Sequence, residues 1–410
     1  MSPAAPAPPV TLFGAFDRHN FGDLLLARVA ARLLRGRPVR CAGLAARDLR
    51  ADGGHRVRPL AQCAPARDEP PAPLLHVGGQ LLTCSAWQAA AMLLPPEEAG
   101  AAIAWLAPRA LARRRWTRAS LGLDDQVPYL LPRALAGRFA PVLALGLGGA
   151  GLEHGPRRLR AEALAKLRAM DAVAVRDAAT QALLAAAGVR ARLLPDPAVL
   201  TARLFGAPIR RRAARGEIAA LRSRFGGGYL ALQLAAEFGD DATLDTLARR
   251  LDAVAAAHDL GLVLFRAGTA PWHDDAAVLR RLAARLRAPA AVMDSVHLWD
   301  LCALLAGSAA YCGSSLHGRI VATAFGRPRL NLLPPQGGAD SVEGAAKHRA
   351  YVESWELPGL PGCVAVADAG EALRVALAAD PARLRAHGHA LAAAFRAGFE
   401  GEFAPWLRPG

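Results

Sequence analysis

Short apolar runs along this chain alternate with stretches in which apolar residues recur at helical spacing. Residues 24–34 show the helical pattern, because Leu24, Leu25, Val29 and Leu33 fall on one face. Short apolar strands alternating with helices predict a parallel sheet that is covered on both faces. In the first half of the chain, strands are expected at 10–15, 74–79, 141–149, 171–177 and 188–197.

The same alternation begins again at residue 229. Residues 339–360 look irregular, and helices at 369–378 and 381–398 finish the chain. We therefore expect an α/β protein with two doubly wound Rossmann-like domains facing across a cleft, the architecture called GT-B-like. Strands are expected at 229–234, 261–265, 291–293, 309–312 and 329–333, and helices at 241–257, 274–287 and 297–306.

Length supports a division into two domains. A chain of 410 residues exceeds one ordinary core, so two domains of roughly 200 residues each are the starting expectation. Residues 36–73 are poor in pattern and suggest one short strand and a long loop. The expected segments are a disordered leader at 1–10, an N-terminal domain at 11–205, a linker at 206–228, a C-terminal domain at 229–370, and helices at 371–410 that are candidates to pack back on the N-terminal domain.

Composition narrows the class of protein. The net charge of +15 is carried almost wholly by arginine, which suits a phosphorylated substrate or peripheral contact with an anionic membrane surface. No aromatic platform is interleaved with the arginines, so nucleic-acid binding is not expected. The six cysteines lack metal-ligand spacing and read as buried thiols of a reducing compartment. With no signal peptide and no transmembrane segment recognised, a cytoplasmic location is expected.

Residues 309–328 carry the clearest candidate chemistry. An apolar strand leads into Gly313-Ser314-Ser315-Leu316-His317-Gly318, and a helix follows until Gly326-Arg327-Pro328. The free N–H groups and the positive dipole end of that helix favour an anion. His317 stands at this turn, where an imidazole can bind a phosphate or transfer a proton, and Arg319 follows it. Helix capping alone would also explain such a turn.

Other loops should meet at the same edge of each sheet, because ligands of doubly wound sheets bind at the carboxyl ends of the strands. The first is Asn20-Phe21-Gly22-Asp23, although its spacing matches neither GxGxxG nor a P-loop. Arg176-Asp177 ends another strand, and Gly78-Gly79 and Gly148-Gly149 end two more. Asp23 and Asp177 can equally be helix caps, and Arg176 can equally pair with Asp177.

Five motifs in one order make the chain resemble the polysaccharide pyruvyl transferase family. The resemblance runs from about residue 11 to about 357. Its motifs are residues 14–23 with Asn20-Phe21-Gly22-Asp23, Val175-Arg176-Asp177 with a following helix and Gly188, Pro195-Asp196-Pro197, His273-Asp274-Asp275, and Ser314-Ser315-Leu316-His317-Gly318 through Gly326-Arg327-Pro328.

The resemblance implies an enzyme, a transferase that moves a pyruvyl group from phosphoenolpyruvate to two hydroxyls of a sugar, forming a cyclic ketal and releasing phosphate. It implies that His317 and Arg176 bind this donor and serve catalysis. Many members carry Arg where this chain has Ser315, and others carry Ser. The positive charge that holds the donor's phosphate or carboxylate must then come from Arg319 or Arg176, or the donor binds more weakly.

The candidate roles follow from what ketal formation needs: cations for a carboxylate and a phosphate, an acid for the methylene carbon, and a base for the sugar hydroxyl. No metal and no cofactor besides the donor substrate are expected; the polar run at 273–275 reads as a helix cap. A glycan or lipid-linked glycan precursor of exopolysaccharide biosynthesis is the expected acceptor. The catalytic candidates are His317, Asp23 and Asp177, and the substrate-binding candidates are Arg176, Ser314, Ser315, Leu316, Gly318, Arg319, Asn20, Gly22, His273 and Trp355.

Two rival interpretations stay open on the residues alone. A glycosyltransferase of the same architecture would use a nucleotide sugar, although no acidic residue is clearly placed for a ribose. A non-catalytic relative would bind a glycan or a partner. The acceptor sugar, its linkage and the oligomeric state leave no mark in the sequence.

Overall fold

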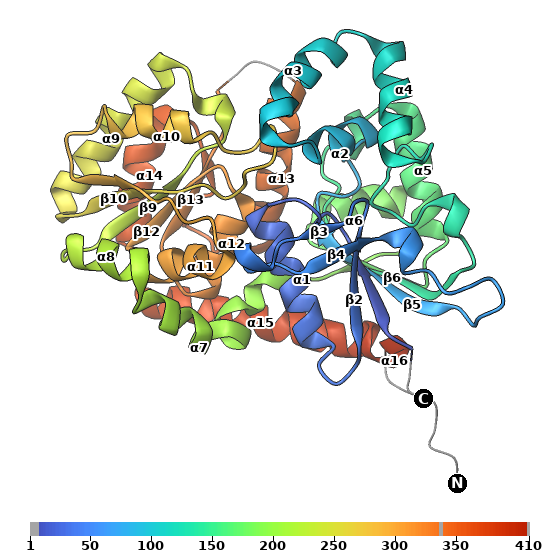
Figure 1. Cartoon of the computed structure of the whole chain (residues 1–410). Coiled ribbons are helices and arrows are strands. Elements are labelled where there is room, and N and C mark those ends of the chain that lie inside the picture. Colours follow the sequence, from blue (N-terminus) through green and yellow to red (C-terminus); the bar gives the residue numbers. More distant parts are fainter. Residues whose placement is uncertain (1–7, 336–338, 408–410) are drawn as a thin grey trace. The chain divides into compact units, whose positions relative to one another are not determined.

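The computed structural model describes residues 8–335 and 339–407, which form two compact units (Figure 1). Unit 1 holds the described residues of Met1–His19, Asp23–Pro197 and Ala394–Gly410, and unit 2 holds Asn20–Gly22 and Ala198–Ala393. Each unit contains a sheet, and every pair of neighbouring strands in the two sheets is parallel except β3 with β4. The expected pair of parallel α/β sheets is therefore confirmed.

Unit 1 is built on an eight-stranded sheet in the order β3-β4-β2-β1-β5-β6-β7-β8. The chain moves outward from β1 to β2 and then returns to the other side of β1, where Leu12 pairs with both Cys41 and Leu75. Its strands are β1 (Val10–Phe13), β2 (Val39–Gly43), β3 (Arg47–Asp48), β4 (Arg56–Pro59), β5 (Ala72–Gly79), β6 (Phe139–Leu147), β7 (Ala172–Val175) and β8 (Arg192–Leu193).

Helices cover the sheet of unit 1, and its core lies beneath them. Phe13, Leu74, Leu147 and Val175 from four strands belong to one buried cluster, which explains why these strands read as uninterrupted apolar runs. The helices of this part of the chain are α1 (Phe21–Leu33), α2 (Ala86–Met92), α3 (Pro96–Leu106), α4 (Ala110–Leu121), α5 (Arg157–Arg168) and α6 (Ala178–Ala186).

Unit 2 contains a six-stranded sheet in the order β11-β10-β9-β12-β13-β14. Its strands are β9 (Tyr229–Gln233), β10 (Gly261–Leu264), β11 (Ala290–Val292), β12 (Ala310–Gly313), β13 (Arg329–Leu332) and β14 (Cys363–Val364). Its helices are α7 (Thr201–Ala213), α8 (Gly216–Arg224), α9 (Asp241–His258), α10 (Ala276–Ala283), α11 (Leu298–Gly307), α12 (Leu316–Ala324), α13 (Ala339–Trp355) and α14 (Ala369–Leu377).

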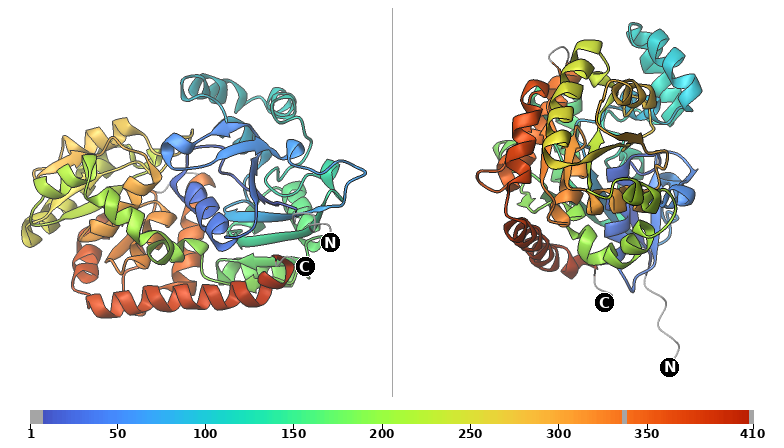
Figure 2. Two further views of the ribbon diagram at one scale, coloured as in Figure 1. Left: turned by 60° about the horizontal axis from the view of Figure 1, so that its bottom comes forward. Right: turned by 90° about the vertical axis from the view of Figure 1, so that its left-hand side faces the viewer.

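The end of the chain belongs to both units. Helix α15 (Pro381–Glu402) starts among the residues of unit 2, and its last residues are grouped with unit 1, as is α16 (Ala404–Leu407). Within unit 1, a Cβ on Gly398 would lie 2.1 Å from Leu194, and Arg37 donates to the carbonyl of Leu407 over 2.7 Å. Figure 2 shows α15 as one long helix.

Three expectations about local structure were wrong. Residues 36–73 hold β2, β3 and β4, whose short edge pairing leaves little apolar pattern. Most of the stretch 206–228, expected to be the linker, forms α7 and α8, and it belongs to unit 2, which resumes at Ala198. Residues 339–355 form α13, where polar residues are mixed with apolar ones all along the helix. The leader expected at 1–10 lies outside the described residues up to position 7, and Val10 already starts β1.

Within residues 8–335 and 339–407, no helix is both long enough and apolar enough to cross a bilayer.

Candidate active site

The strand order of unit 2 changes direction between β9 and β12. The chain leaves β9 toward β10 and β11, and then returns to the other side of β9 with β12. In doubly wound sheets, the crevice at such a switch point, at the carboxyl ends of the strands, is where ligands bind. Gln233 ends β9 and Ser314 follows β12, so these two polar residues stand at the switch point of unit 2.

Asp274 is the titratable group of this switch point. One carboxylate oxygen accepts a hydrogen bond from Gln233 Nε2 at 2.7 Å, and the other accepts from the backbone N–H of Ala267 at 2.5 Å. Burial raises the pKa of Asp274 from 3.8 to about 7, although both hydrogen bonds oppose the shift. A carboxyl group of this kind can give or take a proton near neutral pH.

Gln233 joins Asp274 to the turn after β12. Its amide nitrogen donates to Asp274, and its amide oxygen accepts from the hydroxyl of Ser314 at 3.3 Å. The same hydroxyl accepts from the backbone N–H of Ala235 at 2.9 Å. The carboxyl group therefore has a fixed position relative to the turn that carries the candidate histidine.

His317 lies in the first turn of α12 and is 9% exposed. Its imidazole occupies the space beside Gly22: a Cβ on Gly22 would lie 1.9 Å from Nδ1 of His317. The segment Asn20–Gly22 is held in unit 2 by a hydrogen bond of 2.7 Å from Phe21 N to Ala267 O and by a bridge between Asn20 and Gly268. Asn20, Gly22, His317 and the loop bearing Asp274 therefore form one cluster.

His273 belongs to the same cluster. Its Nε2 lies 3.5 Å from Nδ2 of Asn20, and Gly268 packs against its ring. Asn20 Oδ1 also accepts from the N–H of Gly22 at 3.0 Å, which closes the turn before α1. Asn20 and His273 are half-buried, as a surface for a polar ligand would require.

The other residues of the histidine turn hold the helix in place. The Ser315 side chain is the N-cap of α12 and accepts from the N–H of Gly318 at 3.2 Å. Gly318 has no Cβ because one would lie within 2.5–2.7 Å of the Tyr311 ring, and Tyr311 in turn bonds the backbone of Ser315. Leu316 is 5% exposed and packs in the core. Leu316 and Gly318 thus contact protein, where the sequence suggested contacts to substrate.

Arg319 is fully buried in an ionic network and does not reach the turn. Its five N–H donors are all engaged, by Glu356 twice and by Asn331, Pro361 and Gly362 once each. Of the alternatives that the sequence left open for the charge that holds a donor anion, Arg319 is the less suited, because an arginine with all donors used has none left for a ligand.

Glu356 is shared between two arginines. Its carboxylate oxygens lie 2.5 Å from nitrogens of Arg319 and Arg329. Burial alone would raise the pKa of Glu356, but the two guanidinium groups outweigh it and lower the pKa from 4.5 to about 2. Asn331, bonded to Arg319, donates to the carbonyls of Gly313 and Ser315. The network thereby holds the backbone of the turn after β12 in place. Trp355, half-buried, precedes Glu356 at the end of α13.

Unit 1 contains a second set of candidate residues at the carboxyl edge of its own sheet. Arg176, directly after β7, is 2% exposed and forms an ion pair of 3.3 Å with Asp196, not with Asp177. It also donates to Gln80 Oε1 at 3.1 Å. Gly148 makes room for both side chains, since a Cβ there would lie 2.5 Å from Gln80 and 2.7 Å from Arg176.

Asp177 is the N-cap of α6 and accepts from the N–H of Thr180 at 2.7 Å. It is 2% exposed. A buried carboxylate that holds a helix start is poorly suited to be a base, so this candidate is better explained by capping, the alternative that the sequence left open.

Asp23 lies near a buried group that sequence reasoning missed. Arg18 Nη2 pairs with Asp23 at 3.5 Å, and Arg18 Nη1 donates to Tyr129 Oη at 2.9 Å, with the guanidinium stacked over the Tyr129 ring. Tyr129 donates to Asp17 at 2.8 Å. Asp17, Arg18 and Asp23 follow β1, beside the switch point between β1 and β5, and Tyr129 comes from the segment before β6. Only the position of Arg18 in the loop at 14–23 could have indicated it from the sequence.

Asp274 and Gln233 were also absent from the candidates, although both left a trace in the sequence. Gln233 is the polar residue at the end of an apolar strand, and Asp274 stands in the motif His273-Asp274-Asp275. In that motif, Asp275 caps α10 through the N–H of Ala277 at 2.7 Å.

Within residues 8–335 and 339–407, no three His, Cys, Asp or Glu side chains come together as a metal site.

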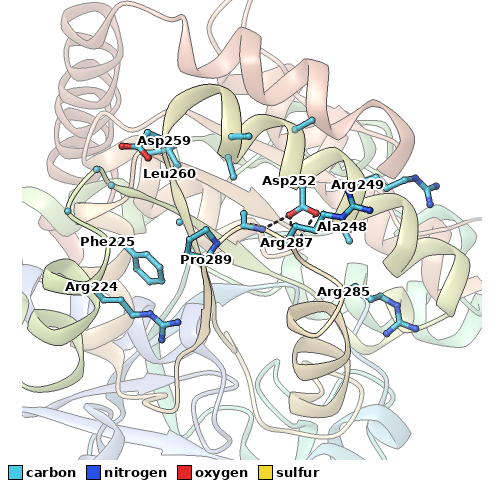
Figure 3. Close-up of a pocket in the computed structure, with 18 of the residues that line it drawn as sticks. Arg224, Phe225, Ala248, Arg249, Asp252, Asp259, Leu260, Arg285, Arg287 and Pro289 are labelled. Carbon is cyan, nitrogen blue, oxygen red and sulfur yellow. Dashed lines mark hydrogen bonds between the residues drawn. The ribbon is translucent and has the colours of Figure 1, made fainter.

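A cavity of about 970 Å³ lies elsewhere in unit 2 (Figure 3). It is lined by residues that precede β9, β10 and β11, including Phe225, Leu260 and Pro289, so it opens at the amino ends of these strands. Asp252 in its wall accepts from the backbone N–H groups of Arg287 and Ala288. Because ligands of such sheets bind at the opposite edge, this cavity is not the candidate active site.

Comparison with solved structures defines the fold class. The S. aureus MnaA–UDP co-structure matches with a TM-score of 0.53 at 12% identity, over 98% of this chain and 98% of that chain. UDP-GlcNAc 2-epimerase from Neisseria meningitidis matches with a TM-score of 0.49 at 12% identity, over 96% and 98%. Trehalose 6-phosphate synthase from Burkholderia multivorans matches with a TM-score of 0.48 at 13% identity, over 98% and 95%. Together with the two parallel sheets, the first of these matches, whose TM-score is above 0.5, shows the expected GT-B-like α/β fold.

The family model for polysaccharide pyruvyl transferase matches residues 120–333, which is just over half of the 410 residues. The match includes β7 with Arg176, the loop with His273 and Asp274, and the turn with His317. The chain belongs to the polysaccharide pyruvyl transferase family, and the resemblance seen in the sequence is confirmed. No curated protein matches the sequence.

Proposed function

We propose that this protein transfers the pyruvyl group of phosphoenolpyruvate to two hydroxyls of a sugar, forming a cyclic ketal and releasing phosphate. Family membership supports this class of reaction. The observation that carries the proposal is the placement of Asp274. A partly buried carboxyl group with a pKa of about 7 stands at the switch point of unit 2, in the cluster that contains His317.

In the proposed first step, protonated Asp274 gives its proton to the methylene carbon of phosphoenolpyruvate. The electrons of the carbon–carbon double bond form the new C–H bond, and positive charge develops on the neighbouring carbon. A sugar hydroxyl attacks that carbon and loses its proton to a base. A second hydroxyl then displaces phosphate, which leaves with the electrons of its C–O bond. The proton released by one hydroxyl restores Asp274, and the other goes to phosphate.

His317 and the start of α12 are proposed to bind the phosphate. The imidazole stands in the first helical turn, where N–H groups and the helix dipole favour negative charge. The ring fills the space that the missing Cβ of Gly22 leaves. Ser314 and Asn20 lie in the same cluster and are proposed to contact substrate through their polar side chains.

Arg176 stays the proposed ligand for the carboxylate of the donor. Its guanidinium lies at the carboxyl edge of the sheet of unit 1, and Asp196 and Gln80 hold it in one orientation. Asp23 stays a candidate base for an acceptor hydroxyl. Trp355 stays a candidate for stacking on a sugar face. The proposed acceptor is a glycan or lipid-linked glycan precursor, and the proposed location is the cytoplasm.

The test is phosphate release from phosphoenolpyruvate in the presence of candidate glycans, with the mass of the product measured. His317→Ala should abolish phosphate release while the unfolding temperature changes little. His389→Ala is the matched control, because His389 is exposed on α15 and should leave turnover unchanged. Full turnover by His317→Ala would contradict the proposal.

Two outcomes would support the rival functions. Thermal protection by UDP or GDP sugars, and not by phosphoenolpyruvate, would indicate a glycosyltransferase that uses a nucleotide sugar. Unchanged cellular function of the His317→Ala variant would indicate a relative that binds a glycan or a partner without catalysis.

A further inference from the structure

The two most exposed large apolar side chains in the described part of the chain flank one turn. Leu111 is 76% exposed and Trp105 is 55% exposed. Trp105 stands near the end of α3 and Leu111 near the start of α4, with residues 107–109 between the helices. Ala107, Pro108 and Ala110 are exposed as well. This turn, called the tip below, therefore exposes two large and three small apolar residues to solvent, with the exposed Arg109 between them.

The packing of α3 and α4 leaves this tip uncovered. Both helices pack mainly on α2, and Figures 1 and 2 show them standing away from the sheet of unit 1. The contact with α2 is made further along α4, where Trp116 meets Trp87 edge to face at 5.6 Å. Thr117, further along α4, is buried as well, so this part of α4 packs on the protein while Trp105 and Leu111 stay exposed.

Positive charge continues from the tip along α4. Residues 105–121 contain Arg109, Arg113, Arg114, Arg115 and Arg118, and no acidic residue. Three of these arginines have protein partners: Arg109 donates to the carbonyl of Trp105, Arg113 donates to the carbonyl of Ala107, and Arg118 pairs with Asp124 at 3.1 Å. Arg114 and Arg115 are exposed and form no salt bridge with any described residue.

We propose that the turn between α3 and α4 docks this protein on an anionic lipid bilayer. Tryptophan favours the boundary between headgroups and acyl chains, and a projecting leucine gains free energy by leaving water. Arginines beside such an apolar tip attract anionic headgroups and bind their phosphates. The combination of exposed Trp105 and Leu111 with unpaired Arg114 and Arg115 matches the chemistry of that surface.

Two other occupants fit less well. Nucleic acid would need an open aromatic face for stacking, but the guanidinium of Arg109 lies over the Trp105 ring at 5.0 Å. A second copy of the chain docked through this tip in a two-fold contact would bring like-charged arginines against one another. An anionic bilayer contacts both kinds of residue, the apolar ones at the boundary of its acyl chains and the basic ones at its headgroups.

The experiment is flotation of the full chain with vesicles of phosphatidylcholine alone or of phosphatidylcholine with phosphatidylglycerol. Binding to the anionic vesicles only is expected, and it should weaken as salt is added. The double variant Trp105→Ser/Leu111→Ser should lose at least about tenfold in vesicle affinity, because most of the inserted apolar area is removed. Arg114→Glu/Arg115→Glu should lose at least about tenfold through repulsion by the headgroups.

Matched controls separate this site from a general effect. Arg157→Glu/Arg158→Glu makes the same charge change at two exposed adjacent arginines, at the start of α5. Val375→Ser removes an apolar side chain that is 43% exposed on α14. Both controls should bind vesicles like the unchanged protein, and circular dichroism should show every variant folded. Because no step requires turnover, the outcome is independent of the proposed function.

Three results would overturn the proposal. Equal binding by all four variants would show that the tip is not the contact. Binding of a DNA duplex through Arg114 and Arg115 without vesicle binding would indicate a nucleic-acid surface. A dimer that is lost in the Trp105→Ser/Leu111→Ser variant, again without vesicle binding, would indicate a second copy as the occupant.

Discussion

Gly22 leaves the space that the imidazole of His317 fills, although 294 intervening positions separate them in the chain. A Cβ on Gly22 would lie within 1.9–2.5 Å of three ring atoms of His317, so no other residue fits at position 22 without moving the ring. Two motifs that lie far apart in the sequence thus meet in one contact. They are Asn20-Phe21-Gly22-Asp23, through its glycine, and Ser314-Ser315-Leu316-His317-Gly318, through its histidine.

Gly22→Ala should therefore impair the protein through His317. Relief of the clash requires the imidazole to move, and overpacking of this kind costs typically about 1–3 kcal/mol. We expect phosphate release to fall by at least about tenfold, because His317 is the proposed ligand of the phosphate and small displacements of such a group cost rate. The measurement is phosphate release together with the free energy of unfolding.

Gly100→Ala is the matched control for that substitution. Gly100 also lies in a helix, α3, but a Cβ there would meet no atom within 4 Å. It should gain up to about 1 kcal/mol from the higher helix propensity of alanine and keep full activity. Equal effects of Gly22→Ala and Gly100→Ala would show that the contact with His317 has no role.

Asp274→Asn should remove the proposed proton donor with little change in shape. Loss of a general acid lowers turnover by about 10²–10⁴-fold. In the unchanged protein, activity should fall as pH rises through about 7, because Asp274 then loses the proton it must donate. Asp275→Asn is the control; it weakens only the cap of α10 and should leave the pH profile unchanged. An unaltered profile in Asp274→Asn would exclude Asp274 as the acid.

Asp274 should also affect stability in a defined direction. Its pKa is higher in the folded state, at about 7, than the ordinary value of 3.8. Its contribution is therefore most favourable below pH 3.8 and is lost as pH rises through about 7. Asp274→Asn should reduce the difference in free energy of unfolding between pH 5 and pH 8, which denaturant titration at the two pH values would measure.

Glu356 should produce the opposite pH dependence. Its pKa is lowered from 4.5 to about 2, so the stabilisation is present above pH 4.5 and is lost as pH falls toward 2. Glu356→Gln leaves two buried arginines without their carboxylate and should cost about 3–5 kcal/mol. Unfolding of the variant should no longer depend on pH between 4.5 and 2 through this group. Glu353→Gln, on the exposed side of α13, should have no comparable effect.

Arg176→Lys tests the proposed ligand of the donor carboxylate. Lysine keeps the charge but lacks the planar fork that Gln80 and Asp196 hold, so KM for phosphoenolpyruvate should rise by at least about tenfold. Steady-state kinetics with varied donor would measure this rise. A changed unfolding temperature with an unchanged KM would instead assign Arg176 a structural role in the ion pair with Asp196.

The sequence by itself determined the alternation of strands and helices, the two parallel sheets, the family, and the loops that carry polar residues at the strand ends. Local backbone geometry explains this success. Side chains on one face recur every two residues in a strand and every three to four in a helix, so each element can be recognised from its own residues. Local backbone geometry also explains why capping could be foreseen for Asp177 and for the turn that contains Ser315.

Tertiary structure alone decided which side chains meet. Arg319 looked like a second cation of the turn, but Glu356, 37 positions further on, holds it in the core. Arg176 pairs with Asp196 and not with its neighbour Asp177, and Gln233 reaches Asp274 across 41 positions. These pairs depend on strand order and on the direction in which each side chain leaves its strand. Strand order is set by how the whole core packs, so no local pattern could reveal that Asp274 lies in one cluster with His317.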